Sequence, residues 1–158
     1  MHRYQTFGRR FLAAIIDGII FSIISILINN VFGRHYVDTI AGTIIYNALF
    51  YVYSIFLHYK YGQTLGKKIT NVKVVSNTDE GKLIGLANAF KRDSIGILFI
   101  VFEVLAKHLD LENSGIGNYL FLFSGFGWVL AELISMLFNR KRRAIHDFLA
   151  NSVVINVK

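Results

Sequence analysis

The sequence contains no cysteine and no proline, and acidic residues are scarce, ten against 17 Lys and Arg. Without cysteine the chain cannot form a disulfide bond, a thiolate metal site or a cysteine nucleophile. Without proline, any kink in a helix must come from glycine or serine. The shortage of acidic residues leaves a net charge of +7, which in a soluble protein would indicate nucleic-acid binding.

Apolar residues, in contrast, make up 54% of the chain, and its mean hydropathy is +0.47. This composition is more apolar than that of an ordinary soluble domain. The basic residues lie at the ends of the apolar segments, which favours anionic lipid head groups over nucleic acid as their partner. We therefore expect a single membrane domain over residues 1–158 that contacts the lipid bilayer and does not bind nucleic acid.

Four apolar segments are candidates to cross a bilayer. They cover residues 11–32, 39–59, 90–107 and 117–138. Charged residues interrupt the third segment, and a re-entrant or interfacial helix is the alternative for it.

The positions of Lys and Arg predict the orientation of these segments. All but two of the 17 lie in residues 1–10, 60–92 and 139–158. Four spans place these three basic segments on one side of the membrane, and the positive-inside rule makes that side the cytoplasm. We expect a multi-pass protein of the cell membrane with both termini in the cytoplasm.

Carboxylates inside the apolar segments are the candidates for function, because an ionised group at that depth is costly unless it is paired or lines a wet cavity. Asp17 lies two turns inside the first segment and could bind a proton or a monovalent cation. Glu103 and Glu132 are accessory candidates that would bracket Asp17 along a polar path. The alternative is a structural ion pair of Asp17 with a basic residue: Arg10, Arg92 or Arg143.

Small residues recur every four positions on two of the segments, a pattern typical of close helix contacts in membranes. The first segment has Ala14, Gly18 and Ser22, and the fourth has Gly127, Ala131 and Ser135. We expect these two helices to pack on each other through the small residues. The alternative is that each packs on a second copy of the chain in a homo-oligomer.

Two short stretches rich in β-branched residues, 72–75 and 153–157, are predicted on the same side of the membrane. Unpaired backbone groups beside a membrane favour pairing, so we expect these two stretches to form a short β-ribbon. Residues 82–84 offer a second partner through a local hairpin, which would allow up to three strands. The ribbon would hold Asp147 beneath the first helix.

Three motifs follow one another along the chain. Arg10, Ala13 and Asp17 open the first segment, Gly-Gln-Thr-Leu-Gly-Lys-Lys occupies 62–68, and Arg-Ala-Ile-His-Asp occupies 143–147. In this order they resemble the RDD family of bacterial integral membrane proteins, whose signature arginine and two aspartates match Arg10, Asp17 and Asp147. The resemblance suggests transport, including cation–proton exchange. The residues assigned to its cytoplasmic motif are Gly62, Gln63, Thr64, Gly66 and His146.

One position departs from the pattern of the family, in which His-Asp is commonly followed by Ala-Gly-Thr. This chain has Ala150, Asn151 and Ser152 there. Asparagine adopts the left-handed backbone that glycine would supply, and serine keeps a hydroxyl group, so we expect the turn to survive.

The sequence argues against several other functions. Residues 62–68 lack the spacing of a phosphate-binding loop, which argues against nucleotide binding. The five histidines include no pair four residues apart, so neither a metal site nor a cofactor is expected. No nucleophile accompanies His146 and Asp147, which argues against an enzyme. The basic run 140–143 is interpreted as a lipid and topology signal.

The expected fold is therefore an all-α bundle of four transmembrane helices with a small cytoplasmic cap, in which Arg10 and Asp147 form a charge-assisted pair. The leading function is a small transporter of monovalent cations or protons that uses Asp17. The alternative is a structural or partner-binding membrane subunit without transport activity. A polar cavity that reaches Asp17 would favour the transporter, and fully paired charges would favour the subunit.

Overall fold

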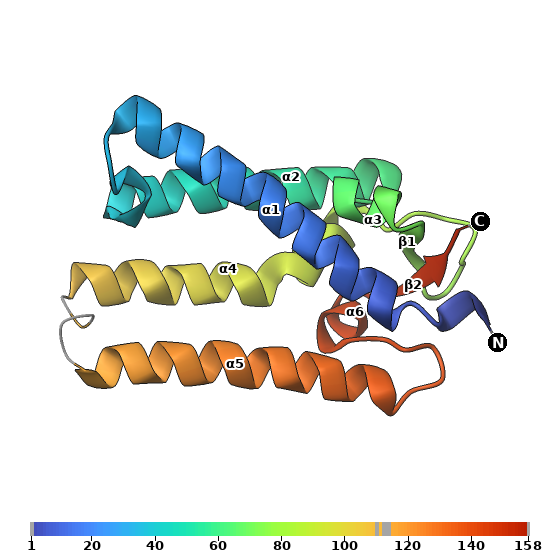
Figure 1. The fold of residues 1–158 in the computed structure, drawn as a ribbon. Coiled ribbons are helices and arrows are strands. Elements are labelled where there is room, and N and C mark those ends of the chain that lie inside the picture. The colour runs from blue at the N-terminus through green and yellow to red at the C-terminus, as the bar shows by residue number, and fades with distance from the viewer. Residues whose placement is uncertain (1, 110, 112–114, 158) are drawn as a thin grey trace.

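A computed structural model describes residues 2–109, 111 and 115–157 of the chain. Its four long helices lie where the sequence predicts the four apolar segments, and they are α1 (Phe7–Phe32), α2 (Ile40–Tyr61), α4 (Leu86–His108) and α5 (Gly115–Leu137). A 3-10 turn, η2 (Tyr36–Asp38), joins α1 to α2. Figure 1 shows an elongated bundle in which α1 crosses α2 obliquely.

Apart from η2, the smaller elements lie together with both chain ends at one end of the bundle (Figure 1). We call this group the cap; it comprises η1 (His2–Tyr4), α3 (Leu65–Ile69), β1 (Val72–Ser76), α6 (Ile145–Leu149) and β2 (Ser152–Asn156). The mostly helical fold with a small sheet agrees with the fold class expected from the sequence.

Two helices, α1 and α2, are long and apolar enough to cross a membrane by their length and composition. Many of their apolar side chains are exposed, among them Ile19, Ile23 and Val52. So large an exposed apolar surface would be unfavourable in water and is suited to lipid. The two helices meet through aromatic rings, because Phe21 packs edge-on against Phe50 and Tyr53 at centroid distances of 4.9 and 5.2 Å.

The predicted β-ribbon is confirmed. Strands β1 and β2 pair antiparallel with Val74 opposite Val154, and both valines are buried. The third strand predicted at 82–84 is wrong, since the sheet has two strands. Ser76 donates one hydrogen bond to the Lys82 carbonyl, and Ile84 then turns into the core instead of pairing.

The predicted packing of the first and fourth helices through their small residues is also wrong. A Cβ atom added to Gly18 or to Gly127 would meet nothing within 4 Å. Large aromatic side chains fill the contact between α1 and α2, and α1 packs against α3 at its cap end. The alternative, self-association through these exposed positions, stays a prediction.

Candidate functional site

Asp147 is fully buried in the cap and joins two of the long helices. Its Oδ2 accepts a hydrogen bond from Arg10 Nη2 of α1 at 2.7 Å, and its Oδ1 accepts one from Arg92 Nη1 of α4 at 2.5 Å. The predicted Arg10–Asp147 pair is thus confirmed, with Arg92 as a second partner. Charge-assisted contacts of this kind are about twice as strong as neutral hydrogen bonds.

Neutral donors complete the surroundings of the Asp147 carboxylate. The Ala144 backbone N–H donates to Oδ2 at 3.0 Å, and the Ser152 hydroxyl donates to Oδ1 at 3.3 Å. Burial by itself would raise the pKa of Asp147, but the charges of Arg10 and Arg92 hold it well below its usual value of 3.8. The carboxylate is therefore ionised near neutral pH.

The turn that departs from the family pattern keeps its geometry. Asn151 has a left-handed backbone with φ of 44°, as expected of a residue in place of glycine. The Ser152 hydroxyl also accepts a hydrogen bond from Arg92 Nη1 at 3.0 Å. Both substitutions are therefore compatible with the buried site.

His146 connects the two arginines to α5. Its Nε2 lies 3.2 Å from Arg10 Nη2 and 2.9 Å from Arg92 Nη2, and a guanidinium can only donate, so Nε2 must accept. This assigns the imidazole proton to Nδ1, which lies 2.9 Å from Glu132 Oε1. Burial and the charge of Arg92 lower the pKa of His146, which agrees with a neutral ring.

The charges of this network balance. Two arginines face two carboxylates, and the exposed fractions of their side chains are 9% for Arg10, 4% for Arg92, 0% for Asp147 and 11% for Glu132. The second oxygen of Glu132, Oε2, is buried and has no hydrogen-bond partner among the described residues. The result is a closed charged network that fixes α1, α4, α5 and α6 relative to one another.

Asp17 forms a different kind of site. Its Oδ1 accepts hydrogen bonds from Tyr53 Oη at 2.8 Å and from the Gly66 backbone N–H at 2.9 Å, and its Oδ2 accepts one from Thr64 Oγ1 at 2.6 Å. All three donors are neutral. The carboxylate therefore fastens α1 to α2 and α3 without a counter-charge in direct contact.

The ion pair considered for Asp17 is wrong for the part of the chain that the structure describes. Arg10 and Arg92 contact Asp147 instead. Arg143 donates to the backbone carbonyls of Ser152 and Asp147 at 2.9 and 3.0 Å. Arg10, Arg92 and Arg143 make their contacts in and around the Asp147 site. The groups that donate hydrogen bonds to Asp17 are therefore neutral.

The motif at residues 62–68 builds the Asp17 site. Gly62 ends α2 with a left-handed φ of 72°, and the Gln63 side chain donates to the Val72 carbonyl at 2.9 Å. Thr64 begins α3, and its hydroxyl both accepts from the backbone N–H of Lys67 and donates to Asp17. The left-handed Gly62 and the Thr64 cap thus turn the chain sharply from α2 into α3.

Gly66 lets α3 approach α1 closely. A Cβ atom at this position would overlap the Ala13 carbonyl oxygen and would lie 2.9 Å from the Asp17 carboxyl carbon. Ala13 itself is fully buried. A glycine is therefore required where the Gly66 N–H reaches Asp17.

Lys67 lies near both sites. Burial and the charge of Arg92 lower its pKa to about 8, while the charge of Asp17 acts in the opposite direction. Both the Asp147 network and the Asp17 site therefore act on this ammonium group.

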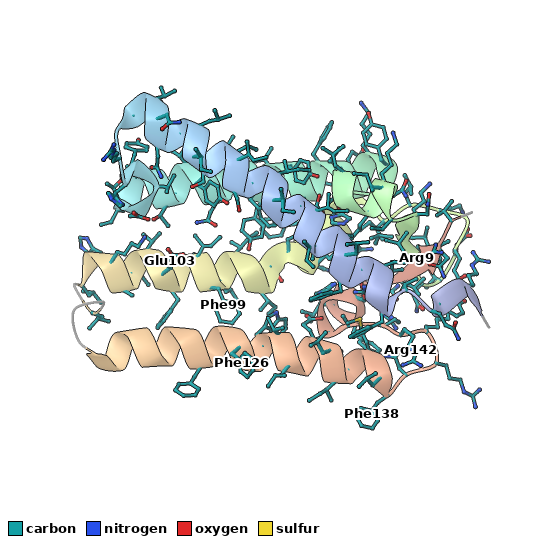
Figure 2. All side chains as sticks on the ribbon, viewed as in Figure 1. Arg9, Phe99, Glu103, Phe126, Phe138 and Arg142 are labelled. Atoms are coloured by element: carbon teal, nitrogen blue, oxygen red, sulfur yellow. The ribbon has the colours of Figure 1, made fainter. Side chains whose placement is uncertain are left out.

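The predicted polar path from Glu103 through Asp17 to Glu132 is wrong. Glu103 pairs with Lys107 at 3.2 Å, and Lys107 also donates to the Thr43 hydroxyl near the α1–α2 connection. Figure 2 shows Glu103 far along α4 from the cap, where Arg142 lies. Glu132 contacts His146 in the cap, so the three carboxylates occupy three separate places.

Arg92 and Tyr53 are the residues that sequence reasoning missed. The sequence indicates Arg92 only as an alternative partner of Asp17, yet it is buried two turns inside α4, which begins at Leu86, and it contacts Asp147. A charged residue inside an apolar segment is costly unless it is paired, and this reasoning applies to Arg92 as it does to Asp17. No spacing indicates Tyr53, because it meets Asp17 only through the packing of α2 on α1.

The lipid interpretation of the basic run 140–143 also needs correction. Lys141 contacts Glu80 at 3.0 Å, and Arg143 contacts the backbone of β2. These two side chains are held by the protein. The described residues contain no group of three His, Asp or Glu side chains placed to hold a metal ion.

The comparisons with known proteins identify the family. No curated protein matches the chain, and neither does any solved structure. The model of the RDD family matches residues 4–151, a range that includes both carboxylate sites from Arg10 to Asp147. The chain therefore belongs to the RDD family.

Proposed function

We propose that α1, α2, α4 and α5 all cross the cell membrane and that the cap lies in the cytoplasm. The family and the two apolar helices support a membrane protein. Residues 1–10, 60–92 and 139–158, which supply the elements of the cap, contain all but two of the Lys and Arg residues. The positive-inside rule assigns such a face to the cytoplasm.

Reporter fusions test this topology. A reporter after residue 158 and a second one within 33–38 are expected on opposite sides of the membrane. Labelling on the same side would contradict the four-span arrangement.

We infer that the protein acts as a structural or partner-binding membrane subunit, and that Asp17 braces the fold instead of binding ions. The observation behind this inference is that the Asp17 carboxylate already accepts three hydrogen bonds. Asp147 is neutralised by two arginines, and Glu103 pairs with Lys107. Asp147 and Glu103 thus have counter-charges, and Asp17 is held by neutral donors, so the protein itself engages all three carboxylates, which supports the subunit over the transporter.

Transport of protons or monovalent cations is the second candidate. The observation that favours it is the buried Oε2 of Glu132, for which the described part of the chain supplies no hydrogen-bond partner. Glu132 connects through His146 to Arg10 and Arg92. A proton that reached Glu132 would change the charge balance of the whole network.

Ion flux in proteoliposomes distinguishes these functions. We expect wild type, Asp17→Asn and Glu132→Gln to leak no more than empty liposomes under proton, sodium and potassium gradients. Flux that Asp17→Asn abolishes would restore Asp17 as the ion-binding residue. Flux that only Glu132→Gln abolishes would establish the second candidate.

A second copy of the chain is the partner that the exposed small residues of α1 would suit, because Gly18 leaves room for close backbone contact. Gly18→Leu is expected to shift an oligomer to monomer in crosslinking, while the neighbouring exposed Ile19→Leu leaves it unchanged. An identical distribution for both variants would contradict self-association at this face.

A further inference from the structure

We propose that the pocket at the end of α2 binds the phosphate of an anionic phospholipid through Lys60, Lys68 and Lys73. The inference rests on the proposed cytoplasmic position of the cap, because only then does the pocket lie at the membrane surface. One lipid held in this pocket is a specific site, unlike the general attraction of a basic surface for anionic lipids.

The pocket has a volume of about 420 Å³ and lies between the end of α2, α3 and β1. Each of these elements contributes one of the three lysines. Its walls also include Leu57, Leu65 and Leu83. No Asp or Glu is among the described residues that line it, so nothing in the wall offsets the three positive charges.

The three ammonium groups are available to a ligand. In the described part of the chain, none of them forms a hydrogen bond or an ion pair. Lys60 Nζ lies 5.4 Å from the ring centre of Phe56 and 5.5 Å from that of Tyr61. These ring contacts position the ammonium group without neutralising it.

Several other basic side chains near the cap are already engaged. Arg10 and Arg92 contact Asp147, and Lys141 contacts Glu80. A larger cleft of about 850 Å³ contains Arg3, Arg9 and Lys73 but also Glu80, which pairs with Arg3 at 3.2 Å. The lysine pocket is therefore the better site for an anion.

The apolar surface beside the pocket favours a lipid over a soluble phosphate. Leu65 and Ile69 lie one turn apart on α3, and their exposed fractions are 47% and 65%. Phe56 and Tyr61 are exposed at the end of α2. A short helix with exposed apolar residues beside lysines is suited to the boundary between head groups and acyl chains. A phospholipid whose phosphate lies among the lysines would place its acyl chains against these residues.

The test uses the purified full-length chain in a neutral detergent, with phosphatidylglycerol or phosphatidylcholine added. Native mass spectrometry measures bound lipid, and thermal unfolding measures its stabilising effect. Lys68→Gln with Lys73→Gln is compared with a control that removes the same charge outside the pocket, Lys91→Gln with Arg140→Gln. Lys68, Lys91 and Arg140 are exposed, so their substitution should not disturb the fold. The melting temperature without lipid reports whether each variant folds normally.

Wild type is expected to prefer phosphatidylglycerol. The pocket variant should bind it more weakly by about fivefold per lysine, or about 25-fold for both. The control variant should keep the affinity of the wild type. Equal weakening in both variants, or no preference for phosphatidylglycerol over phosphatidylcholine in wild type, would overturn the proposal.

Two further arms separate the sources of phosphate and the two proposals. Glycerol 3-phosphate and inorganic phosphate are added without lipid, and stabilisation equal to that by phosphatidylglycerol would overturn the lipid assignment in favour of a soluble ligand. Reporter fusions on wild type report the topology independently. A correct topology with no pocket effect would reject this site alone, whereas a cap outside the cytoplasm would reject the proposed orientation.

Discussion

Two buried carboxylates hold this molecule together by different means. Asp147 lies against two guanidinium groups and belongs to a network whose charges balance. Asp17 accepts hydrogen bonds from two hydroxyl groups and one backbone N–H. The first site joins α1, α4 and α5 to the cap, and the second joins α1 to α2 and α3.

The difference teaches what each site tolerates. Loss of Asp147 leaves two buried arginines without their counter-charge, and an unpaired buried charge is among the most costly defects in a protein. Loss of one donor to Asp17 removes one hydrogen bond of three and creates no new charge. We therefore expect the two sites to respond to substitution by clearly different amounts.

The largest effect is expected for Asp147→Ala. This change leaves Arg10 and Arg92 buried without their counter-charge and should lower the free energy of unfolding by about 3–5 kcal/mol. Denaturation in detergent, followed by circular dichroism, measures it. Asp79→Ala is the control, because Asp79 is exposed, pairs with exposed Lys82 and accepts a hydrogen bond from the backbone N–H of the exposed Gly81. Equal stability of the two variants would show that the arginines do not depend on Asp147.

Thr64→Val should have the next largest effect. It removes the hydroxyl that donates to Asp17 Oδ2 and that caps α3 by accepting from the Lys67 N–H, while keeping the shape of the side chain. The lost hydrogen bond to the charged group should cost about 1.5–3 kcal/mol, and the weak 3.4 Å cap should add less than that. The exposed Thr78→Val is the control. A loss for Thr64→Val as large as that for Asp147→Ala would abolish the distinction between the two sites.

The Asp147 site was largely predictable from the sequence. The signature residues Arg10 and Asp147, together with the orientation from Lys and Arg positions, place both charges at one face. The β-branched stretches at 72–75 and 153–157 predict the ribbon that fixes α6. The left-handed Asn151 follows from the resemblance, because asparagine stands where the family commonly has glycine.

The Asp17 site could not be predicted in the same way. Its donors come from α2 and α3, and they reach Asp17 only because Gly66 allows α3 to pack on Ala13. No periodicity in the sequence encodes that contact. The third strand at 82–84 failed for a similar reason, since Ile84 packs into the core beside α4 and so cannot extend the sheet.

The two sites should also differ in their response to pH, because only the Asp147 site contains an imidazole. The pKa of His146 is lowered in the folded protein from its usual 6.5, so the neutral form is favoured by folding. Its contribution is full above pH 6.5 and is lost as the pH falls through the folded-state pKa, by at most about 1.4 kcal/mol per pH unit.

Unfolding of wild type and His146→Gln between pH 8 and pH 5 measures this contribution. The wild type should lose more stability than the variant on acidification, whereas His35→Gln, an exposed control, should follow the wild type. Parallel curves for wild type and His146→Gln would mean that the ring accepts a proton in the folded state as readily as in the unfolded state.

The smallest effects, and the sharpest comparison, come from two double-mutant cycles. In the first, Arg10→Ala and Asp147→Ala are combined, and the coupling should be about 1 kcal/mol or more because the two charges are in direct contact at 2.7 Å. In the second, Tyr53→Phe and Asp17→Asn are combined, and the coupling should be about 0.5 kcal/mol, since one neutral donor of three is involved. Strict additivity in the first cycle would rule out the Arg10–Asp147 contact. A second coupling as large as the first would mean that the Tyr53 hydroxyl stabilises its carboxylate as strongly as a guanidinium does, and the charge of the donor would then no longer explain how the two sites differ.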